Sequence, residues 1–388
     1  MVSIRSAASF QAEVGSGRIS GANVLIFRRG KPVFSKSFGK IDVKTGTPMT
    51  PQAIFRIHSM SKPVTSVAAL MMVDDGKIKL DDPLSKFIPS FAKVRVGVES
   101  KAANGDPLLQ PVPVDRPITI RDLLRHSSGI TYGFYGKGLV RNAYGNADLF
   151  ADGLDNATVA EKLAQLPLAE QPGTVWDYGH STDVLGRVVE VVSGQSLYQF
   201  EKKRLFDPLG MIDTAYYVAD PAQHHRIAEP VPSDNDFRTG GARNPRLFTK
   251  WESGGGGLLT TMGDFSRFAK MILQGGQLDD KRYLSPKAFT EMTTNAVAPA
   301  TSVKRGEYYF PGDGFGFGLG FGVRTEAGNA NPPAPGSLGE LKWDGAGGTY
   351  FWVDRAQDMF AILLIQSPSE RGRIQPAFKK LVYDALEQ

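Results

Sequence analysis

The stretch FRIHSMSKPVTSV, residues 55 to 67, places Ser59 three residues before Lys62 at the predicted start of a helix. The run that follows, PVTSVAALMMV, is apolar and ends before Gly76, a typical C-terminal signal. We therefore expect a largely buried helix that begins near Ser59. A separation of three residues on a helix returns to nearly the same face, so the hydroxyl and the amine can meet.

A serine and a lysine at this spacing can act as a nucleophile with its base. Lys62 must then be neutral near pH 7, which requires its pKa to fall by roughly three units from about 10.4. Burial and the positive end of a helix dipole both lower the pKa of a lysine. The alternative is that Ser59 merely caps the helix. A second copy of the pattern, Ser90 to Lys93, follows Pro89 and precedes a strand-like stretch, so it suits this chemistry less.

The composition describes an ordinary globular protein with a large core: 388 residues, 41% hydrophobic and 22% charged. The absence of cysteine excludes disulfides, thiolate metal sites and cysteine nucleophiles. The net charge is +5, but the basic residues are scattered, so we expect no nucleic-acid binding. There is no apolar run of roughly 18 residues and no signal-peptide pattern in residues 1–20, so we expect a cytoplasmic protein that does not enter a membrane.

Hydrophobic patterning predicts an α/β protein of the α+β type, with an antiparallel sheet flanked by helices. Residues 21–40 read as a hairpin, and strands are expected at 314–323, 348–354 and 359–366, the last two adjacent and antiparallel, before a final amphipathic helix. We expect 1–84 and 235–388 to form the sheet domain and 85–234 a mostly helical inserted domain, with the active site at their interface.

The chain resembles the penicillin-recognising serine hydrolases, the superfamily of serine β-lactamase-like and penicillin-binding-protein-like enzymes. Within it the resemblance is strongest to family VIII carboxylesterases, relatives of class C β-lactamases. It rests on HSMSKPVTS at 58–66, LLRHSSGITYGF at 123–134, PGTVWDYGHSTDVLGRVVEVVSG at 172–194, PLGMIDTAYYV at 208–218, GGGGLLTTMGDFSRF at 254–268 and WDGAGGTYFWVD at 343–354. It implies the β-lactamase/transpeptidase-like fold.

The resemblance assigns three catalytic roles: Ser59 as nucleophile, Lys62 as base, and Tyr178, which follows Pro-Gly-Thr, as the tyrosine that passes protons. The literal strings KTG at 44–46 and YGN at 144–146 stand at the wrong places in the chain to be the family motifs. We expect an ammonium near Tyr178 to lower the pKa of its phenol, so that Lys62 and Tyr178 titrate as one coupled pair.

The third family motif, Lys-Thr-Gly, is replaced by Trp343-Asp344-Gly345, which we assign to substrate binding. This replacement removes the cation and hydroxyl that hold a substrate carboxylate, and so favours a neutral ester or amide. The resemblance implies an oxyanion hole from the backbone N–H groups of Ser59 and Ala346, although the glycines there could simply form a bulge or strand end.

His180 stands where many relatives have Asn or Ser. It could orient Lys62, contact the substrate or fill a polar niche.

We predict a serine carboxylesterase that hydrolyses short-chain or aryl esters through an acyl-serine, with a small-molecule ester as partner and neither metal nor cofactor. A β-lactamase, an acyltransferase or an amidase could use the same acyl-enzyme, and a binding protein could retain the fold without turnover. The sequence has no Gly-x-Ser-x-Gly elbow for a Ser-His-Asp hydrolase and no clustered zinc ligands. The oligomeric state is left open.

Overall fold

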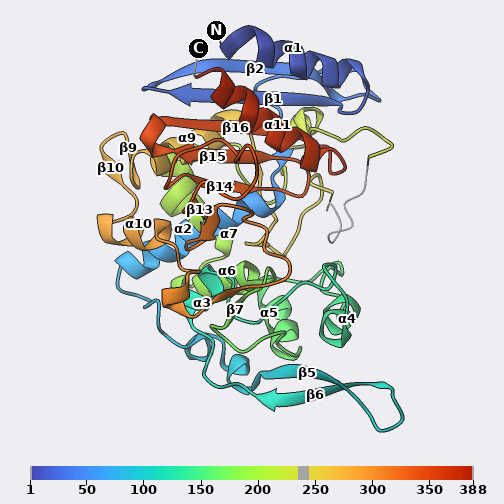
Figure 1. Cartoon of the computed structure of the whole chain (residues 1–388). Helices are drawn as coiled ribbons and strands as arrows, with labels where there is room; N and C mark the ends of the chain where they lie inside the picture. Colours follow the sequence, from blue (N-terminus) through green and yellow to red (C-terminus); the bar gives the residue numbers. More distant parts are fainter. Residues whose placement is uncertain (1, 235–243, 387–388) are drawn as a thin grey trace.

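A computed structural model describes residues 2–234 and 244–386 of the chain. Its centre is an eight-stranded sheet with the order β12-β13-β14-β15-β16-β1-β2-β3, in which every neighbouring pair is antiparallel (Figure 1). The strands are β1 (Gly21–Arg28), β2 (Lys31–Asp42), β3 (Thr47–Pro48), β12 (Phe315–Phe317), β13 (Gly322–Arg324), β14 (Leu341–Asp344), β15 (Tyr350–Asp354) and β16 (Met359–Ile365).

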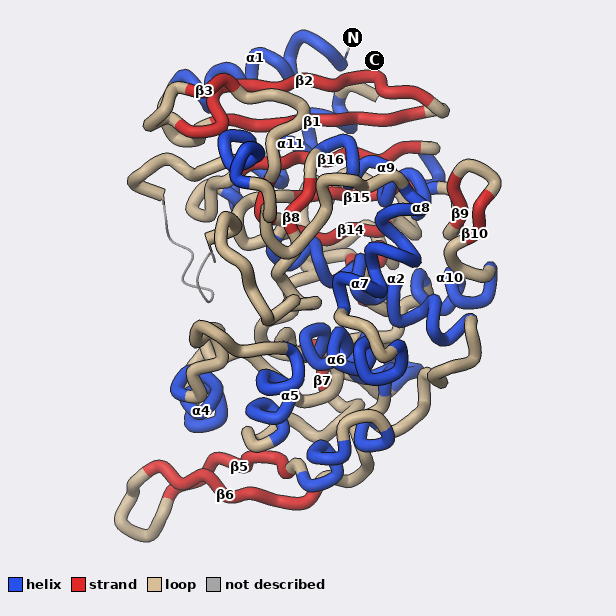
Figure 2. The backbone as a smooth tube through the Cα atoms, turned by 180° about the vertical axis from the view of Figure 1, so that it is seen from behind, coloured by secondary structure: helices blue, strands red, loops and turns tan. Residues whose placement is uncertain are grey.

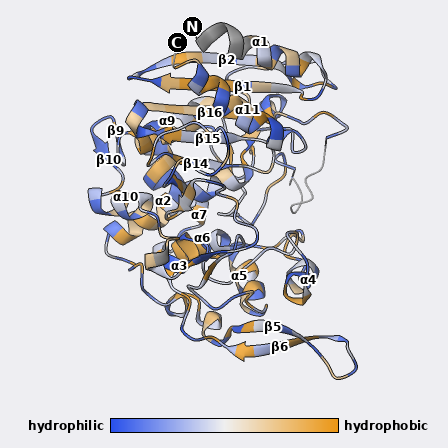
Figure 3. Ribbon diagram, in the orientation of Figure 1, coloured by the Kyte–Doolittle hydropathy of each residue, from blue (hydrophilic) through white to orange (hydrophobic). Residues whose placement is uncertain are grey.

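Two helices cover the outer face of this sheet: α1 (Val2–Gly15) and α11 (Arg371–Asp384). Phe10 of α1 and Phe378 of α11 meet in one hydrophobic cluster with residues of β1, β2, β15 and β16. The hydropathy colouring of Figure 3 shows apolar residues along β1, in agreement with its nearly complete burial. Burial on both faces explains why the central strands are continuously hydrophobic.

The inner face carries α9 (Met262–Leu273) against β15 and β16, and beyond it lies α2 (Ser61–Asp74). Nearly every residue of α2 is buried, because α6 (Ser181–Ser193) and α10 (Pro286–Thr293) also pack on it. The predicted helix behind Ser59 is therefore present and buried. This helix carries Lys62 in its first turn and follows directly after Ser59, so it positions both residues of the candidate site.

The remaining helices and short strands fill the space below and beside this core (Figure 2). The hairpin of β5 and β6 extends furthest from the sheet. The remaining helices are α3 (Ile120–Leu124), α4 (Leu139–Asn146), α5 (Asn156–Ala164), α7 (Leu197–Glu201) and α8 (Asp207–Leu209). The remaining strands are β4 (Phe55–Arg56), β5 (Arg95–Lys101), β6 (Pro107–Pro113), β7 (Val175–Trp176), β8 (Leu259–Thr260), β9 (Gln277–Leu278), β10 (Lys281–Arg282) and β11 (Lys304–Arg305).

The predicted fold class, the N-terminal hairpin and the antiparallel pairing of the last two strands are confirmed. The expected strand at 314–323 is wrong in detail, because it forms two strands that fold back on each other around Gly320, whose φ is +99°. The N-terminal helix α1 was not predicted from the sequence. The domain division at residues 84 and 235 remains a prediction. In the described part of the chain, no helix is both long and apolar enough to cross a membrane.

Candidate active site

Ser59 lies on a single 3-10 turn, His58–Met60, directly before α2. His58 has a φ of +45°, a left-handed conformation that a non-glycine residue rarely adopts. Two hydrogen bonds to the backbone of Leu258 hold the residues on either side of this turn. The Leu258 carbonyl accepts from the N–H of Ile57 at 3.1 Å, and the Leu258 N–H donates to the Ser61 side-chain oxygen, Oγ, at 3.0 Å. The surrounding structure therefore fixes a strained turn at the serine, as is common at functional sites.

Lys62 is 1% exposed, and its amine has three hydrogen-bonding partners. Nζ lies 3.4 Å from Ser59 Oγ, 3.0 Å from Tyr132 Oη and 2.7 Å from the carbonyl oxygen of Gly255. Burial lowers the pKa of Lys62 to about 7, against the opposing charges of Asp183 and Asp344. At neutral pH a substantial share of Lys62 is therefore neutral and able to take a proton from Ser59.

Tyr178 lies beside Lys62, but its hydroxyl does not face the amine. Lys62 Nζ sits 4.5 Å from the centre of the Tyr178 ring, whereas the Tyr178 hydroxyl accepts a hydrogen bond from Trp343 Nε1 at 3.3 Å and also interacts with Ser59. Burial raises the pKa of the Tyr178 phenol well above its usual value. The expectation that a nearby ammonium would lower this pKa is wrong, because desolvation is the stronger effect. The hydroxyl bonded to Lys62 is that of Tyr132.

A buried carboxylate, Asp183 of α6, organises the next layer of the site. Its Oδ2 lies 2.8 Å from His180 Nδ1, and its Oδ1 accepts hydrogen bonds from Ser253 Oγ at 2.6 Å and from the N–H of Gly255 at 3.1 Å. Burial opposes ionisation, but the hydrogen bond and electrostatic interaction with His180, followed by the nearby amine of Lys62, bring the pKa of Asp183 below its usual value. Asp183 thus holds both His180 and the segment whose carbonyl accepts from Lys62.

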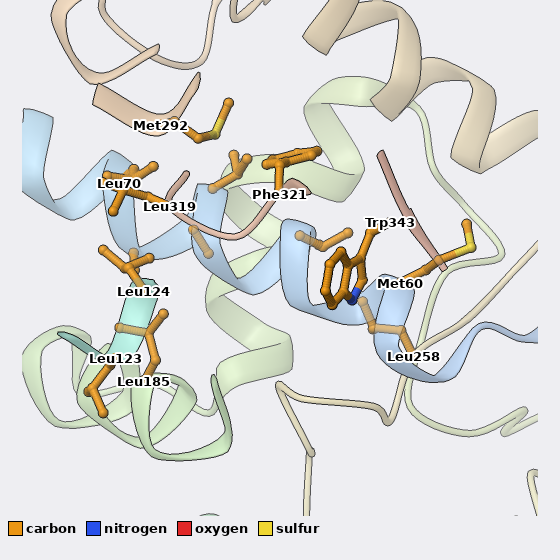
Figure 4. Close-up of a cluster of buried hydrophobic side chains, with 14 of the residues drawn as sticks. Met60, Leu70, Leu123, Leu124, Leu185, Leu258, Met292, Leu319, Phe321 and Trp343 are labelled. Atoms are coloured by element: carbon orange, nitrogen blue, oxygen red, sulfur yellow. The ribbon is translucent and has the colours of Figure 1, made fainter. Parts of the chain in front are cut away.

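The other side of Ser59 is formed by β14 and the glycines after it. Trp343 is 3% exposed and lies near Met60 and Leu258 at the start of α2 (Figure 4). A Cβ at Gly345 would stand 2.3 Å from the carbonyl oxygen of Ile57, so glycine is required for this close approach. The contact brings Ala346 to the serine turn, since both Ser59 and Ala346 line the hollows described next.

Two hollows meet at Ser59, and both are also lined by Tyr135, Tyr178 and Ala346. The wide hollow measures about 950 Å³ with its solvent-open part and is lined mainly by aromatic, aliphatic and glycine residues, among them Phe134, Phe150, Leu247, Trp251 and Leu258, together with His180 and Asp183. The narrow hollow measures about 440 Å³ and adds Phe310, Trp343, Asp344 and Arg371. A substrate at Ser59 therefore meets a larger, mainly apolar side, which also carries Arg56 and Asp183, and a smaller side with Asp344 and Arg371.

A family model for Beta-lactamase matches residues 7–383. The chain belongs to the Beta-lactamase family. Relatives of this family member include lovastatin esterase of Penicillium rubens, 33% identical over 75% of this chain and 72% of that protein, and esterase EstB of Burkholderia gladioli, 28% identical over 97% and 94%. The solved structure of EstCE1, described as a hydrolase with promiscuous acyltransferase activity, has a TM-score of 0.79 and 26% identity, covering 98% of this chain and 97% of that one. The prediction of a serine hydrolase is confirmed.

Most predicted site residues of this Beta-lactamase family member come together around Ser59. Lys62, Tyr178, His180, Trp343, Asp344 and Ala346 all contact or line the site, whereas Gly345 supports it from behind. The rejected serine and tyrosine lie elsewhere: Ser90 is in a 3-10 helix, Pro89–Lys93, and Tyr144 is in α4; neither lines the two hollows. The catalytic and binding roles remain proposals.

Sequence reasoning missed three residues of the site: Tyr132, Asp183 and Gly255. Each stands inside a stretch that carries the family resemblance, ITYGF, STDVLG and GGGGLL, yet no pattern in those stretches indicates a contact with Lys62. Within the described residues, no three His, Asp or Glu side chains gather in a way that could hold a metal ion.

Proposed function

We propose that the chain is a carboxylesterase that hydrolyses short-chain or aryl esters through an acyl-serine at Ser59. The observation that carries the proposal is the buried amine of Lys62, 3.4 Å from Ser59 Oγ, with its pKa lowered to about 7 by burial. A neutral amine at this distance can accept the serine proton as Oγ attacks the ester carbonyl.

In the proposed acylation step, the oxygen of the substrate carbonyl becomes negative and needs donors at that point. The backbone N–H groups of Ser59 and Ala346 are our candidates for this oxyanion hole, since both residues line both hollows. The alcohol then leaves with the proton held by Lys62, and the acyl group stays on Ser59. Tyr178, which interacts with Ser59 through its hydroxyl, is placed to guide that proton.

The lining of the hollows supports a neutral, partly aromatic substrate. The wide hollow offers Phe134, Phe150 and Trp251 to an apolar acyl or alcohol group. Trp343 and Asp344, where the resembled lactamases carry Lys and Thr, give no cation and no hydroxyl for a carboxylate. Two arginines also line the hollows, Arg371 the narrow one and Arg56 the wide one.

Acyl transfer to an alcohol or amine acceptor is the second candidate function. It is favoured by the described acyltransferase activity of EstCE1, to which this chain is similar over nearly its whole length. The same acyl-serine serves both reactions, and the acceptor that reaches the acyl carbon decides between them. A panel of esters and nitrocefin, with and without added alcohols and amines, separates the esterase from the transferase and from a β-lactamase.

The deciding experiment compares initial rates of p-nitrophenyl butyrate hydrolysis for the native protein, Ser59→Ala and Ser90→Ala. Ser90 is the matched control because it begins the second Ser-x-x-Lys copy, 3-10 helix Pro89–Lys93, away from both hollows. We expect Ser59→Ala to lose at least about a thousandfold in kcat/KM and Ser90→Ala to keep the native rate. An active, folded Ser59→Ala protein would contradict the proposal, and nitrocefin turnover far above that of every ester would contradict the esterase.

A further inference from the structure

The release of the acyl group requires a second proton acceptor, because water must be activated to attack the acyl carbon. Lys62 is poorly placed for this task. Its Nζ is bonded to Cε and already has three hydrogen-bonding partners, Ser59 Oγ, Tyr132 Oη and the carbonyl of Gly255, and an amine nitrogen has three hydrogen-bonding positions besides its bond to carbon. One of these positions serves to accept the proton of Ser59, and no position remains for binding a water molecule.

The two tyrosines beside Lys62 do not supply this base. Burial raises the pKa of both Tyr132 and Tyr178 well above the usual value of a phenol. Both hydroxyls stay protonated at neutral pH and can donate or relay a proton, but they rarely carry the negative charge that a base needs.

Of the five histidines of the chain, one combines access with orientation. Burial, followed by the charge of Arg56, lowers the pKa of His58 to about 3. Burial likewise lowers the pKa of His126 well below its usual value, and His126 does not line either hollow. His224 and His225 lie in a 3-10 helix, Pro221–Arg226, that lines neither hollow. His180 lines the wide hollow together with Ser59.

The hydrogen bond between His180 and Asp183 orients the imidazole. Asp183 is ionised, so its carboxylate accepts the proton on Nδ1 at 2.8 Å and leaves the lone pair on Nε2. The ring stands edge-on to that of Tyr132, with centroids 4.4 Å apart, and Tyr132 in turn reaches Lys62. His180 and Asp183 thus form a buried histidine–carboxylate pair on the wall of the serine pocket.

We propose that His180, oriented by Asp183, is the base that activates water to release the acyl group from Ser59. This inference rests on the proposed function. The water oxygen bonds to the acyl carbon as Nε2 of His180 takes its proton, and the tetrahedral intermediate then breaks the bond between that carbon and Ser59 Oγ. Oγ leaves with the electron pair and takes up the proton that the His180 imidazolium gives back through solvent, so that Lys62 stays neutral and His180 is again a free base.

The test is stopped-flow hydrolysis of p-nitrophenyl butyrate by the native protein, His180→Asn and His225→Asn. The asparagine keeps an N–H donor near the place of Nδ1, toward Asp183, but cannot act as a base; His225 is an exposed histidine and serves as the matched control. We expect His180→Asn to give a nitrophenolate burst of one equivalent per site, followed by turnover about a hundredfold slower than native. Intact-mass measurement should show the acyl-enzyme accumulating in His180→Asn but not in the native protein or in His225→Asn.

A nucleophile that needs less help from a base separates this role from a structural one. Hydroxylamine should speed the loss of the acyl group from His180→Asn far more than from the native protein. Asp183→Asn, which leaves the imidazole unoriented, should slow turnover after the burst in the same direction. Native turnover in folded His180→Asn, loss of its burst, or equal hydroxylamine acceleration in both proteins would overturn the proposal. Hydrolysis at the native rate by folded Ser59→Ala would instead overturn the proposed function.

Discussion

Two walls of the site face each other across Ser59, and they differ in the kinds of groups that they present to it. The helical wall consists of side chains from the loop before α4 and the start of α6: Tyr132, Tyr178, His180 and Asp183. The strand wall is the end of β14 and the turn after it, residues 343–348. Hydrogen-bonded ionisable groups dominate the first, whereas a buried indole and closely packed backbone dominate the second.

This difference suggests a division of work within the proposed mechanism. The helical wall holds the groups that move or position protons, through Tyr132 on Lys62 and through Asp183 on His180. The strand wall fixes where the substrate carbonyl can sit, because Gly345 packs directly on the backbone before Ser59. Substitutions on the two walls should therefore fail in different ways. We expect steric and stability losses from the packed backbone of the strand wall, and step-specific losses from the helical wall. Asp344 is the strand-wall residue whose charge also acts on Lys62.

The largest effect is expected from Gly345→Ala on the strand wall. The new Cβ would stand 2.3 Å from the carbonyl oxygen of Ile57 and 2.3 Å from Thr349 Oγ1, so the backbone must shift at the proposed oxyanion hole. We expect kcat/KM to fall by roughly a thousandfold and the free energy of unfolding to fall by about 2–4 kcal/mol.

The control for Gly345→Ala is Gly372→Ala, since a Cβ at Gly372 in α11 would meet nothing within 4 Å. Denaturant unfolding and ester kinetics on both variants check the prediction. Native activity in Gly345→Ala would contradict the claim that the strand wall positions the substrate carbonyl.

A smaller loss is expected from Tyr132→Phe on the helical wall. The change removes the hydroxyl 3.0 Å from Lys62 Nζ while keeping the buried ring, so the amine loses one of its three partners. We expect kcat/KM to fall between about tenfold and a hundredfold, with little loss of stability. Tyr144→Phe, another buried tyrosine outside both hollows, is the control. Equal kinetics in the two variants would mean that Tyr132 only packs.

The smallest effect is a shift in the pH profile. Because Lys62 must be neutral to act as base and its pKa is lowered to about 7, kcat/KM should fall about tenfold per pH unit well below pH 7 and level off above it. Asp344 raises the pKa of Lys62, so Asp344→Asn should move this acid limb to lower pH. Asp152→Asn, at an exposed site, should leave the limb in place. A limb that stays fixed in Asp344→Asn would contradict charge coupling between the strand wall and Lys62.

The sequence predicted those parts of the site that depend on local spacing. Ser59 and Lys62 lie within one helical turn, and Tyr178 could be located by the Pro-Gly-Thr stretch before it. Tyr132 and Gly255 are 70 and 193 residues from Lys62, and only the packing of α2 in the folded chain reveals that they bond to the same amine. A similar reason explains the error on the pKa of Tyr178, since spacing does not show how deeply the folded chain buries the phenol.

The fold shows a similar limit. Alternating and continuous hydrophobic runs were enough to predict the first hairpin and the last two strands, because these pair with neighbours in sequence. The stretch 314–323 has the composition of one strand, yet it turns at Gly320, where a Cβ would lie 2.3 Å from Ser66 Oγ of α2. The close approach of a distant helix decides that turn, and no local pattern records it.

The position of α1 and α11 has a practical meaning for handling the protein. The two helices lie side by side on the outer face of the sheet, joined by an ion pair between Glu13 and Arg373, and both ends of the described chain emerge there (Figure 1). The whole thickness of the sheet separates this face from α2 and Ser59. A purification tag, a fluorescent domain or a solid support attached through either helix would therefore leave the mouth of the serine pocket unobstructed.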